Sequence, residues 1–476
     1  MNRNNFWIHL TVAVVIISMA AILGQVRNWR SSLRGDSAKV IKSTAKPSAA
    51  KRPAEEKEPE VLVKLRPNIS LSEIKKIAAK NNDRVEDEIE SVKGLVAIDD
   101  LDNLAADKVA AQYAAMSDAV IYAEANNKIE LDPIESLPAS VLVDLEESAP
   151  SALMPNDPMF KDQWALNNVG QNGGKSESDI RAIKAWLKTQ GSSDVVVAVL
   201  DSGVNYKHTD FAANMWVRPD NVPVYKDDEL GTFDDLHGFN AVDNLSDPMD
   251  DNGHGTHCAG IIGAEGNNDE GITGINWKVE IMPLKFMGRG GFGTTKDAIE
   301  AINYAIDRKR AGVNVKVINA SWGSTLSSKA LEDTIRAAGE EGILFVAASG
   351  NNSTNNDRRP HYPSNYNLPN VISVAALDRT DNLASFSNFG AKTVHVAAPG
   401  RDILSTWLND DYREASGTSM ATPYVAGIAA LIWSSEPKIT MEKVRERVLK
   451  STDKLDSLTG KVESGGRINA EKALEN

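Results

Sequence analysis

Five short apolar runs between residues 195 and 398 of this 476-residue chain constrain its fold more than any other feature. None shows the alternation of polar and apolar residues that marks a strand with one solvated face. Unbroken runs are typical of strands buried on both faces of a parallel sheet, and helical stretches at 295–308 and 329–339 separate some of them. The sequence therefore predicts an α/β fold with a largely parallel sheet and helices on both faces. The runs cover residues 195–200, 315–318, 343–348, 371–376 and 394–398.

Polar residues follow three of these runs closely. Asp201 comes directly after the first run, Ser321 just after the second, and Gly350-Asn351 after the third. Ligand sites in open α/β sheets gather at the carboxyl ends of the strands. We therefore expect these residues to lie at one functional edge of the sheet.

Asp201, His254 and Ser419 supply the three side-chain types of a serine nucleophile system. A serine hydroxyl is a weak nucleophile at neutral pH and needs a base, whose charged form needs an acceptor. Ser419 precedes Pro423 and an apolar helical pattern, so it is expected near a helix amino terminus, where the dipole favours negative charge. The surrounding GTSMA does not match the GxSxG of an α/β-hydrolase, which argues against a serine esterase or acyltransferase.

Three long motifs resemble those of the subtilases, the subtilisin-like serine peptidases. They are VAVLDSGV, NGHGTHCAG and SGTSMATPYVAG, in the subtilase order Asp, His, Ser. The motif HGTHCAG, with a cysteine after its second His, is similar to that of the proteinase K branch of the family. Tyr424 departs from the family pattern, which often has His at this position. The resemblance covers about 156–474 and implies a subtilisin-like fold. It also implies a serine endopeptidase that hydrolyses peptide bonds through an acyl-enzyme intermediate.

The resemblance also assigns site residues outside the three motifs. It makes the Asn351 amide an oxyanion donor, together with the backbone N–H of Ser419; the alternative for Asn351 is a turn residue. An extended peptide substrate would bind between the two edges of a cleft through backbone hydrogen bonds. His361 would form the floor of the primary pocket. The alternative for these positions is ordinary loop. The residues of the two edges are Ser321, Trp322 and Gly323 on one side, and Gly290 and Gly291 on the other.

Three places in the sequence resemble metal or nucleotide sites. His254 and His257 are three residues apart, but no HExxH motif is present and no third zinc ligand is evident; the resemblance makes His257 a structural partner. GRGGFG lacks the GK[ST] of a phosphate loop. We expect no catalytic cofactor. The resemblance implies structural calcium, with solvated loop residues as the alternative. The matching positions are Asp157, Asp210 and Asn268.

The amino terminus predicts export. Residues 6–23 are nearly all apolar, so 1–24 is interpreted as a signal peptide or an uncleaved membrane anchor. The protein is then secreted, periplasmic or held in the cell envelope, and a tether through 6–23 would make it membrane-anchored. Cys258 is the only cysteine, which excludes intrachain disulfides, CxxC zinc sites and iron–sulfur clusters. Residues 25–59 are expected to be a flexible linker.

A small domain is expected at 60–131. Its pattern is a strand at 61–65, a helix near 71–78, an extended stretch at 94–98, a helix near 105–116 and a strand at 119–123. This order suggests an α+β ferredoxin-like unit, and its position resembles the subtilase propeptide, which inhibits its own enzyme. Residues 132–155 are interpreted as an exposed processing linker, and 156–476 as the peptidase domain. We expect a zymogen that cleaves itself between Asn127 and Asn156.

The net charge of −14 argues against nucleic acid as a partner, since sequence-independent binding needs a basic surface. The expected partners are protein or peptide substrates and the chain's own propeptide, and we expect a monomer. The runner-up function is a catalytically silent peptide-binding protein on the same fold. The complete triad and Asn351 argue against it.

Overall fold

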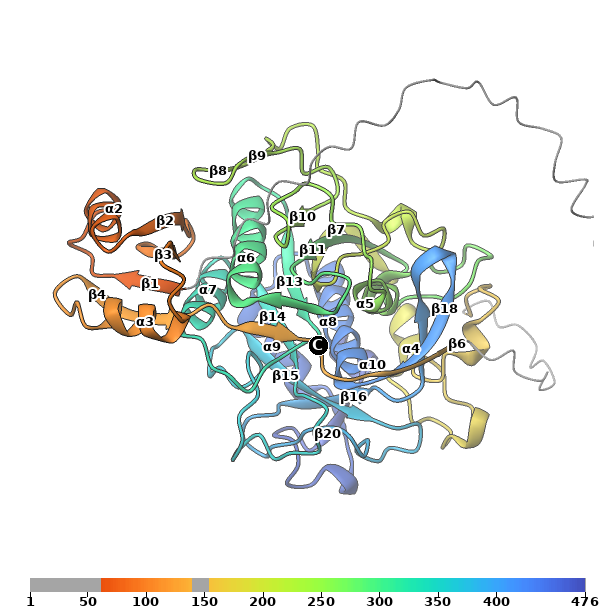
Figure 1. Ribbon diagram of the computed structural model, residues 1–476. Helices are drawn as coiled ribbons and strands as arrows, with labels where there is room; N and C mark the ends of the chain where they lie inside the picture. The colour runs from red at the N-terminus through yellow and green to blue at the C-terminus, as the bar shows by residue number, and fades with distance from the viewer. Residues whose placement is uncertain (1–60, 139–153, 476) are drawn as a thin grey trace, which may run out of the picture. The chain divides into compact units, whose positions relative to one another are not determined.

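A nine-stranded sheet forms the centre of the large domain. The computed structural model describes residues 61–138 and 154–475, which belong to one compact unit, Lys57–Asn476 (Figure 1). Every neighbouring pair in this sheet is parallel except β19–β20. Each of the five apolar runs coincides with one strand, so the parallel sheet is confirmed. In sheet order the strands are β10 (Phe239–Asn240), β11 (Lys278–Lys285), β7 (Gly191–Asp201), β13 (Val315–Ala320), β14 (Leu344–Ala348), β15 (Val371–Leu377), β16 (Val396–Pro399), β20 (Gly466–Ile468) and β19 (Thr452–Lys454).

Helices cover both faces of the sheet, as β7 shows most clearly. Its residues Val197 and Val199 belong to the core that contains α5 and α8, whereas Val196 and Ala198 belong to the core that contains α6 and α7. Successive strand residues point to opposite faces, so apolar residues are needed at every position. The helices are α4 (Ala182–Trp186), α5 (His254–Gly263), α6 (Thr295–Arg310), α7 (Lys329–Glu340), α8 (Thr418–Ser435), α9 (Met441–Lys450) and α10 (Ala470–Ala473).

The small domain has the predicted ferredoxin-like order with one strand more than expected. Its antiparallel sheet runs β2-β3-β1-β4, with α2 and α3 completing a β-α-β-β-α-β order. The missed strand is β2, whose sequence DRVEDE is almost entirely charged and gives no apolar signal. The elements are β1 (Val61–Leu65), α2 (Leu71–Lys80), β2 (Asp83–Glu88), β3 (Leu95–Asp100), α3 (Ala106–Ala114) and β4 (Val120–Ala125).

The small domain packs against α6 and α7. Leu62 and Leu95 share a core with those helices, whereas Val61 and Val63 face the small domain's own core. The carboxylate of Glu124, in β4, accepts hydrogen bonds from Ser328 Oγ and from the backbone N–H groups of residues 329 and 330 at the start of α7. The start of α6 is held by Asn126 and Asn127 in the same way. Both contacts satisfy backbone donors that a helix leaves unpaired at its amino terminus.

The chain after the small domain is extended and pairs twice with the large domain. Strand β5 (Lys128–Glu130) pairs antiparallel with β12 (Phe292–Thr294). Strand β6 (Glu135–Pro138) pairs antiparallel with β18 (Tyr412–Ser416), which in turn pairs with β17 (Ile403–Thr406). Residues 135–138, predicted to lie in an exposed linker, are therefore a strand. A separate hairpin joins β8 (Tyr225–Asp227) to β9 (Gly231–Phe233).

The predictions for 1–24, for 25–59 and for most of the processing linker fall outside the described residues. Among the helices of 61–138 and 154–475, none combines the length and apolarity needed to cross a membrane.

Candidate active site

Asp201 and His254 are brought together by a close approach between β7 and α5. Asp201 is the last residue of β7 and His254 the first of α5. A Cβ at Gly255 would lie 2.1 Å from the Gly203 carbonyl oxygen, so only glycine allows the helix to begin so close to the strand end. Asp250 fixes this helix start, since its Oδ1 accepts hydrogen bonds from the Gly253 N–H (3.0 Å) and the Ser202 hydroxyl (2.9 Å).

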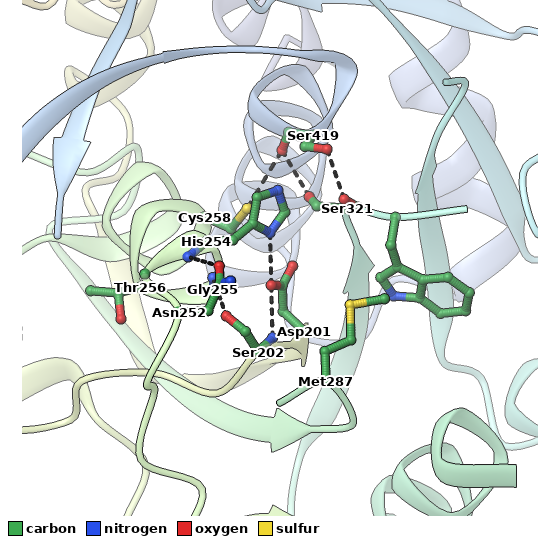
Figure 2. A network of polar contacts seen from close by, with 12 residues as sticks. Asp201, Ser202, Asn252, His254, Gly255, Thr256, Cys258, Met287, Ser321 and Ser419 are labelled. Carbon is green, nitrogen blue, oxygen red and sulfur yellow. Dashed lines mark hydrogen bonds and ion pairs between the residues drawn. The ribbon is translucent and has the colours of Figure 1, made fainter. Parts of the chain in front are cut away.

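The His254 ring is held in one orientation by Asp201. Its Nδ1 lies 2.7 Å from Asp201 Oδ1, and both side chains are buried. Burial acts to lower the pKa of His254, but the charge and hydrogen bond of Asp201 outweigh it and hold that pKa above its ordinary value. Nε2 has no hydrogen-bond partner among the described residues, and Figure 2 shows the ring between the Asp201 carboxylate and Ser419. Nε2 is therefore available as a base.

Ser419 is the second residue of α8, so its predicted place at a helix amino terminus is confirmed. Its hydroxyl donates to the Ser321 carbonyl oxygen at 2.8 Å (Figure 2). The hydroxyl proton of Ser419 therefore points to Ser321 rather than to His254 in this structure.

Pro423 explains why Ser321 and Cys258 surround the backbone of Ser419. A proline has no N–H, so the Ser419 carbonyl lacks the partner that a helix normally provides four residues later. The Ser321 hydroxyl (2.8 Å) and the Cys258 thiol (3.5 Å) donate to that carbonyl instead. Burial raises the pKa of the Cys258 thiol well above its usual value, which keeps it neutral and able to donate.

Asn351 presents an unpaired donor beside Ser419. Its Oδ1 accepts hydrogen bonds from the Thr418 N–H (2.8 Å) and hydroxyl (2.9 Å). A backbone N–H can only donate, so this contact fixes which end of the amide faces Thr418. The opposite end, Nδ2, is buried and has no partner within the described residues. A buried amide donor without an acceptor is costly, and a developing oxyanion would satisfy it.

His257 turns away from this constellation. Its Nε2 lies 3.1 Å and 3.0 Å from the carbonyl oxygens of Ile403 and Arg413. Burial lowers the pKa of His257 to about 3, so the ring is neutral and donates from Nε2. It therefore ties α5 to β17 and β18.

The predicted cleft residues divide into two groups. Trp322 has a buried indole that donates to the Leu200 carbonyl (2.9 Å), so its side chain is core. Gly290 contacts the ring of Phe292. In contrast, the Gly291 carbonyl accepts a hydrogen bond from the Leu131 N–H at 2.8 Å. Gly323 lies against the His361 ring, and His361 Nε2 lies 3.4 Å from Asp132 Oδ2, so Gly291 and His361 both lie beside the segment that contains residues 131 and 132.

The three predicted calcium residues lie together around the loop at 266–274. Asp210 Oδ1 accepts from Asn268 Nδ2 (3.1 Å), and Asp210 Oδ2 accepts from the Ile272 N–H (2.9 Å). Asp157 Oδ2 accepts from the Asn267 N–H (2.7 Å), whereas its buried Oδ1 has no partner in the described chain. Burial raises the pKa of Asp157 to about 6 and that of Asp210 to about 7.

Three contributors to the site were absent from the sequence predictions. They are Thr418, which orients Asn351; Asp250, which fixes the start of α5; and Asp132, which lies 3.4 Å from His361. Asp250 had no usable signal, because it lies four positions before His254 and the N-cap position itself is Gly253. Asp132 had none, since its contact is made across the fold.

Residues 192–466 match the model of the Subtilase family, Peptidase S8. The chain belongs to the subtilase family. It is 37% identical over 317 residues to the thermophilic serine proteinase of Bacillus sp. (strain AK1), covering 66% of this chain and 71% of that protein. It is 36% identical over 321 residues to thermitase of Thermoactinomyces vulgaris, covering 67% of this subtilase and 99% of thermitase. A solved protease from Pseudoalteromonas arctica superposes with a TM-score of 0.56 at 28% identity, covering 67% and 98% of the two chains.

These comparisons confirm the predicted family and fold. This subtilase is a subtilisin-like serine protease, a hydrolase. The likeness to the proteinase K branch stays a prediction, as do the individual roles of the site residues.

Proposed function

We propose that this subtilase is an exported serine endopeptidase that is made as an inhibited precursor and processes itself. The observation that carries the proposal is the buried His254, held by Asp201 at Nδ1 and left unpaired at Nε2 beside Ser419. This arrangement suits a general base for a serine nucleophile.

Each residue has a distinct part in the proposed reaction. His254 takes the proton of Ser419 as Oγ attacks the substrate carbonyl, and Asp201 stabilises the imidazolium that forms. The carbonyl oxygen becomes an oxyanion, which accepts hydrogen bonds from Asn351 Nδ2 and the Ser419 N–H. His254 then donates its proton to the leaving amine. Water attacks the acyl-enzyme with His254 again as base, which releases the acid and restores Ser419.

The segment at 128–134 lies where a substrate would lie. Strand β5 adds itself to the edge of β12, and Leu131 continues the pairing to Gly291. Peptides bind to exposed strand edges in this way. The segment joins the small domain to the cleft, which supports a precursor in which residues 60–131 inhibit their own enzyme.

Labelling with a fluorophosphonate separates the endopeptidase from a silent peptide-binding protein. We expect the wild-type protein to label on Ser419 after its small domain has been removed. Labelling of the intact chain should be slow, because the segment at 128–134 covers the site. Ser419→Ala is the control and should not label. A processed wild-type protein that stays unlabelled would favour the silent alternative.

The interface between the domains contains two buried carboxyl groups without hydrogen bonds. Glu300, on α6, and Asp87, on β2, are both fully buried, and none of their oxygens has a hydrogen-bond partner among the described residues. Lys296 Nζ lies 3.5 Å from Asp87 Oδ2. Burial, followed by the charge of Asp87 and assisted by that of Asp227, raises the pKa of Glu300 well above its ordinary value, while Lys296 acts in the opposite direction. A proton on Glu300 would supply the missing donor.

Release of the small domain is therefore expected to depend on pH. Glu300 binds a proton more tightly in the docked state than in the separated state. Separation of the small domain removes Asp87, whose charge helps to raise the pKa of Glu300. Docking is then strongest below the ordinary pKa of a glutamic acid and weakens as the pH rises through the docked pKa. Glu300→Gln should slow the appearance of peptidase activity at pH 8, because glutamine stays neutral in the docked state at a pH where the carboxyl group of the separated state is ionised.

The control for Glu300→Gln is Glu340→Gln, which neutralises an exposed carboxylate at the end of α7. It should activate like the wild type. The pH dependence of activation should flatten in Glu300→Gln alone. Unchanged activation rates and pH slope in that variant would show that Glu300 does not control docking.

Asp157 and Asp210 fit a structural calcium ion. Calcium prefers carboxylate and carbonyl oxygens, and the buried Asp157 Oδ1 lacks any donor within the described residues. Asp157, Asp210 and Asn268 would hold the ion and join the start of the domain to the loop at 266–274. It would act on stability alone, because binding to the folded state favours that state.

Chelation is expected to lower the thermal midpoint. At a calcium concentration of about 100 times Kd, binding contributes about 2.7 kcal/mol. With an unfolding entropy of about 2.1 cal/mol/K per residue, this corresponds to a shift of about 4 °C for a domain of roughly 320 residues. Differential scanning calorimetry with and without chelator measures it. Asp210→Asn should start from a lower midpoint and respond less. An unchanged midpoint after prolonged chelation would contradict the site.

Export is supported by the names of relatives, which include a halolysin-like extracellular serine protease of Natrialba magadii and the minor extracellular protease Epr of Bacillus subtilis. Amino-terminal sequencing of the exported protein would locate both the leader cleavage and the self-processing site.

A further inference from the structure

The His361 ring lies against two glycines, at the position that the family resemblance assigns to the floor of the primary pocket. A Cβ at Gly323 would lie 2.8 Å from His361 Nε2, and a Cβ at Gly350 would lie 3.0 Å from the same atom. The imidazole therefore packs directly against backbone on both sides, where any larger residue would displace it. Its exposed fraction is only 3%.

The pocket adjoins the reacting atoms. Gly323 is two residues after Ser321, whose carbonyl receives the Ser419 hydroxyl, and Gly350 directly precedes Asn351. A substrate residue whose carbonyl reaches Asn351 Nδ2 would therefore place its side chain between Gly323 and Gly350. The pocket receives the residue on the acyl side of the bond that is cut.

A carboxylate of the chain itself already occupies this pocket. The pairing of Leu131 with Gly291 sets the position of the next residue, Asp132. Asp132 Oδ2 is buried, accepts no hydrogen bond from the described residues, and lies 3.4 Å from His361 Nε2. The remaining partner for this carboxylate is the imidazole.

The position of His361 is set by its backbone. Its N–H donates to Asn365 Oδ1 (3.1 Å), and its carbonyl accepts from the Ser364 hydroxyl (2.7 Å). The next residue, Tyr362, exchanges two backbone hydrogen bonds of 2.7 Å with Ser324, which lies beside the pocket wall. A preorganised donor in a buried site favours the ligand that completes its hydrogen bonds.

We propose that the primary pocket selects an acidic side chain, aspartate or glutamate, and that His361 is the specificity-determining residue. This inference rests on the proposed peptidase function. A buried imidazole donor gains more from an ionised acceptor than from a neutral one. Apolar side chains leave His361 Nε2 unpaired, which the pocket penalises. Asp132 is then the chain's own occupant of the pocket, which reinforces inhibition.

The test compares peptides that differ only in the residue expected to enter the pocket. The full-length protein is incubated until its activity is constant, and kcat/KM is measured for fluorogenic peptides carrying Asp, Asn, Glu, Gln, Leu or Phe there. Serine follows the tested residue, because proline would crowd it. We expect Asp and Glu to exceed their amide counterparts by at least about tenfold, since hydrogen bonds to charged groups are stronger than neutral ones.

Two variants assign this preference to His361. His361→Leu should lose the preference for Asp over Asn and gain at least about tenfold on the Leu peptide. His361→Gln keeps a hydrogen-bond donor, so its preference for Asp over Asn should lie between those of His361→Leu and the wild type. In the intact chain, Asp132→Leu should raise residual peptidase activity above that of Asp132→Asn. The wild-type comparison decides the question even if a His361 variant fails to fold.

The outcomes separate this inference from the function beneath it. Hydrolysis that favours Leu or Phe over Asp, or a preference for Asp that survives in His361→Leu, would overturn the acidic specificity and leave the peptidase intact. Absence of hydrolysis of every peptide, together with absence of fluorophosphonate labelling, would refute the peptidase function and the specificity with it.

Discussion

Ser419→Ala is expected to abolish hydrolysis of casein and to leave the precursor uncut. The change removes the atom that forms the covalent intermediate, and loss of such a nucleophile lowers kcat by about 10⁶-fold. Among the described residues, Ser419 Oγ makes one hydrogen bond, to the Ser321 carbonyl, so the fold should survive the substitution. Casein hydrolysis measures the catalytic effect. Mass spectrometry of the chain, expressed in a host that lacks other secreted peptidases, measures self-processing.

The matched control is Ser416→Ala, which removes a hydroxyl three residues earlier that bonds to the Asp402 N–H rather than to the reacting groups. It should process and hydrolyse casein. Normal maturation of Ser419→Ala in the same host would refute self-cleavage, and normal casein hydrolysis by it would refute the nucleophile.

Asn351→Ala is expected to lower kcat by about 10²–10³-fold with little change in KM. The donor at Nδ2 acts only as the oxyanion forms, so its loss affects the transition state more than substrate binding. Steady-state kinetics on one peptide, at matched concentrations of fluorophosphonate-titrated sites, gives both constants.

Asn351→Asp distinguishes the oxyanion role from a role in the turn. Aspartate keeps an acceptor for the Thr418 N–H and hydroxyl but replaces the free donor with an oxygen. If Asn351 acts on the oxyanion, kcat falls to a similar degree in both variants, or falls further in Asn351→Asp than in Asn351→Ala. Near-normal kcat in Asn351→Asp, with loss only in Asn351→Ala, would mean that orienting Thr418 is all that Asn351 does.

Local patterns determined most of the peptidase fold and the catalytic residue types. The unbroken apolar runs predict buried parallel strands because both faces of each strand are covered, and β7 and β13 to β16 confirm this. Asp201, His254 and Ser419 could be assigned before any coordinates, because the surrounding residues that form the strand end and the two helix starts are contiguous with them. The family comparison agrees with that assignment of the fold.

Strand β2 could not be predicted because two of its three inward residues, Asp83 and Asp87, are charged and only Val85 is apolar. Asp83 accepts a hydrogen bond from the Tyr113 hydroxyl at 2.6 Å, and Asp87 pairs with Lys296 of the large domain. The partners that make these carboxylates tolerable inside come from distant parts of the chain. A pattern based on apolar residues has no access to them.

The sequence by itself thus determined the strands of the central sheet, because each depends on neighbours in the chain. It also supplied the prediction of the triad, and the family resemblance supplied that of Asn351 as the oxyanion donor. Only the tertiary structure decided that β5 and β6 join the large domain, that Trp322 is core, and that Asp132 meets His361. These contacts join residues far apart in sequence, and they are selected by burial and by unpaired donors and acceptors that exist only once the chain has folded.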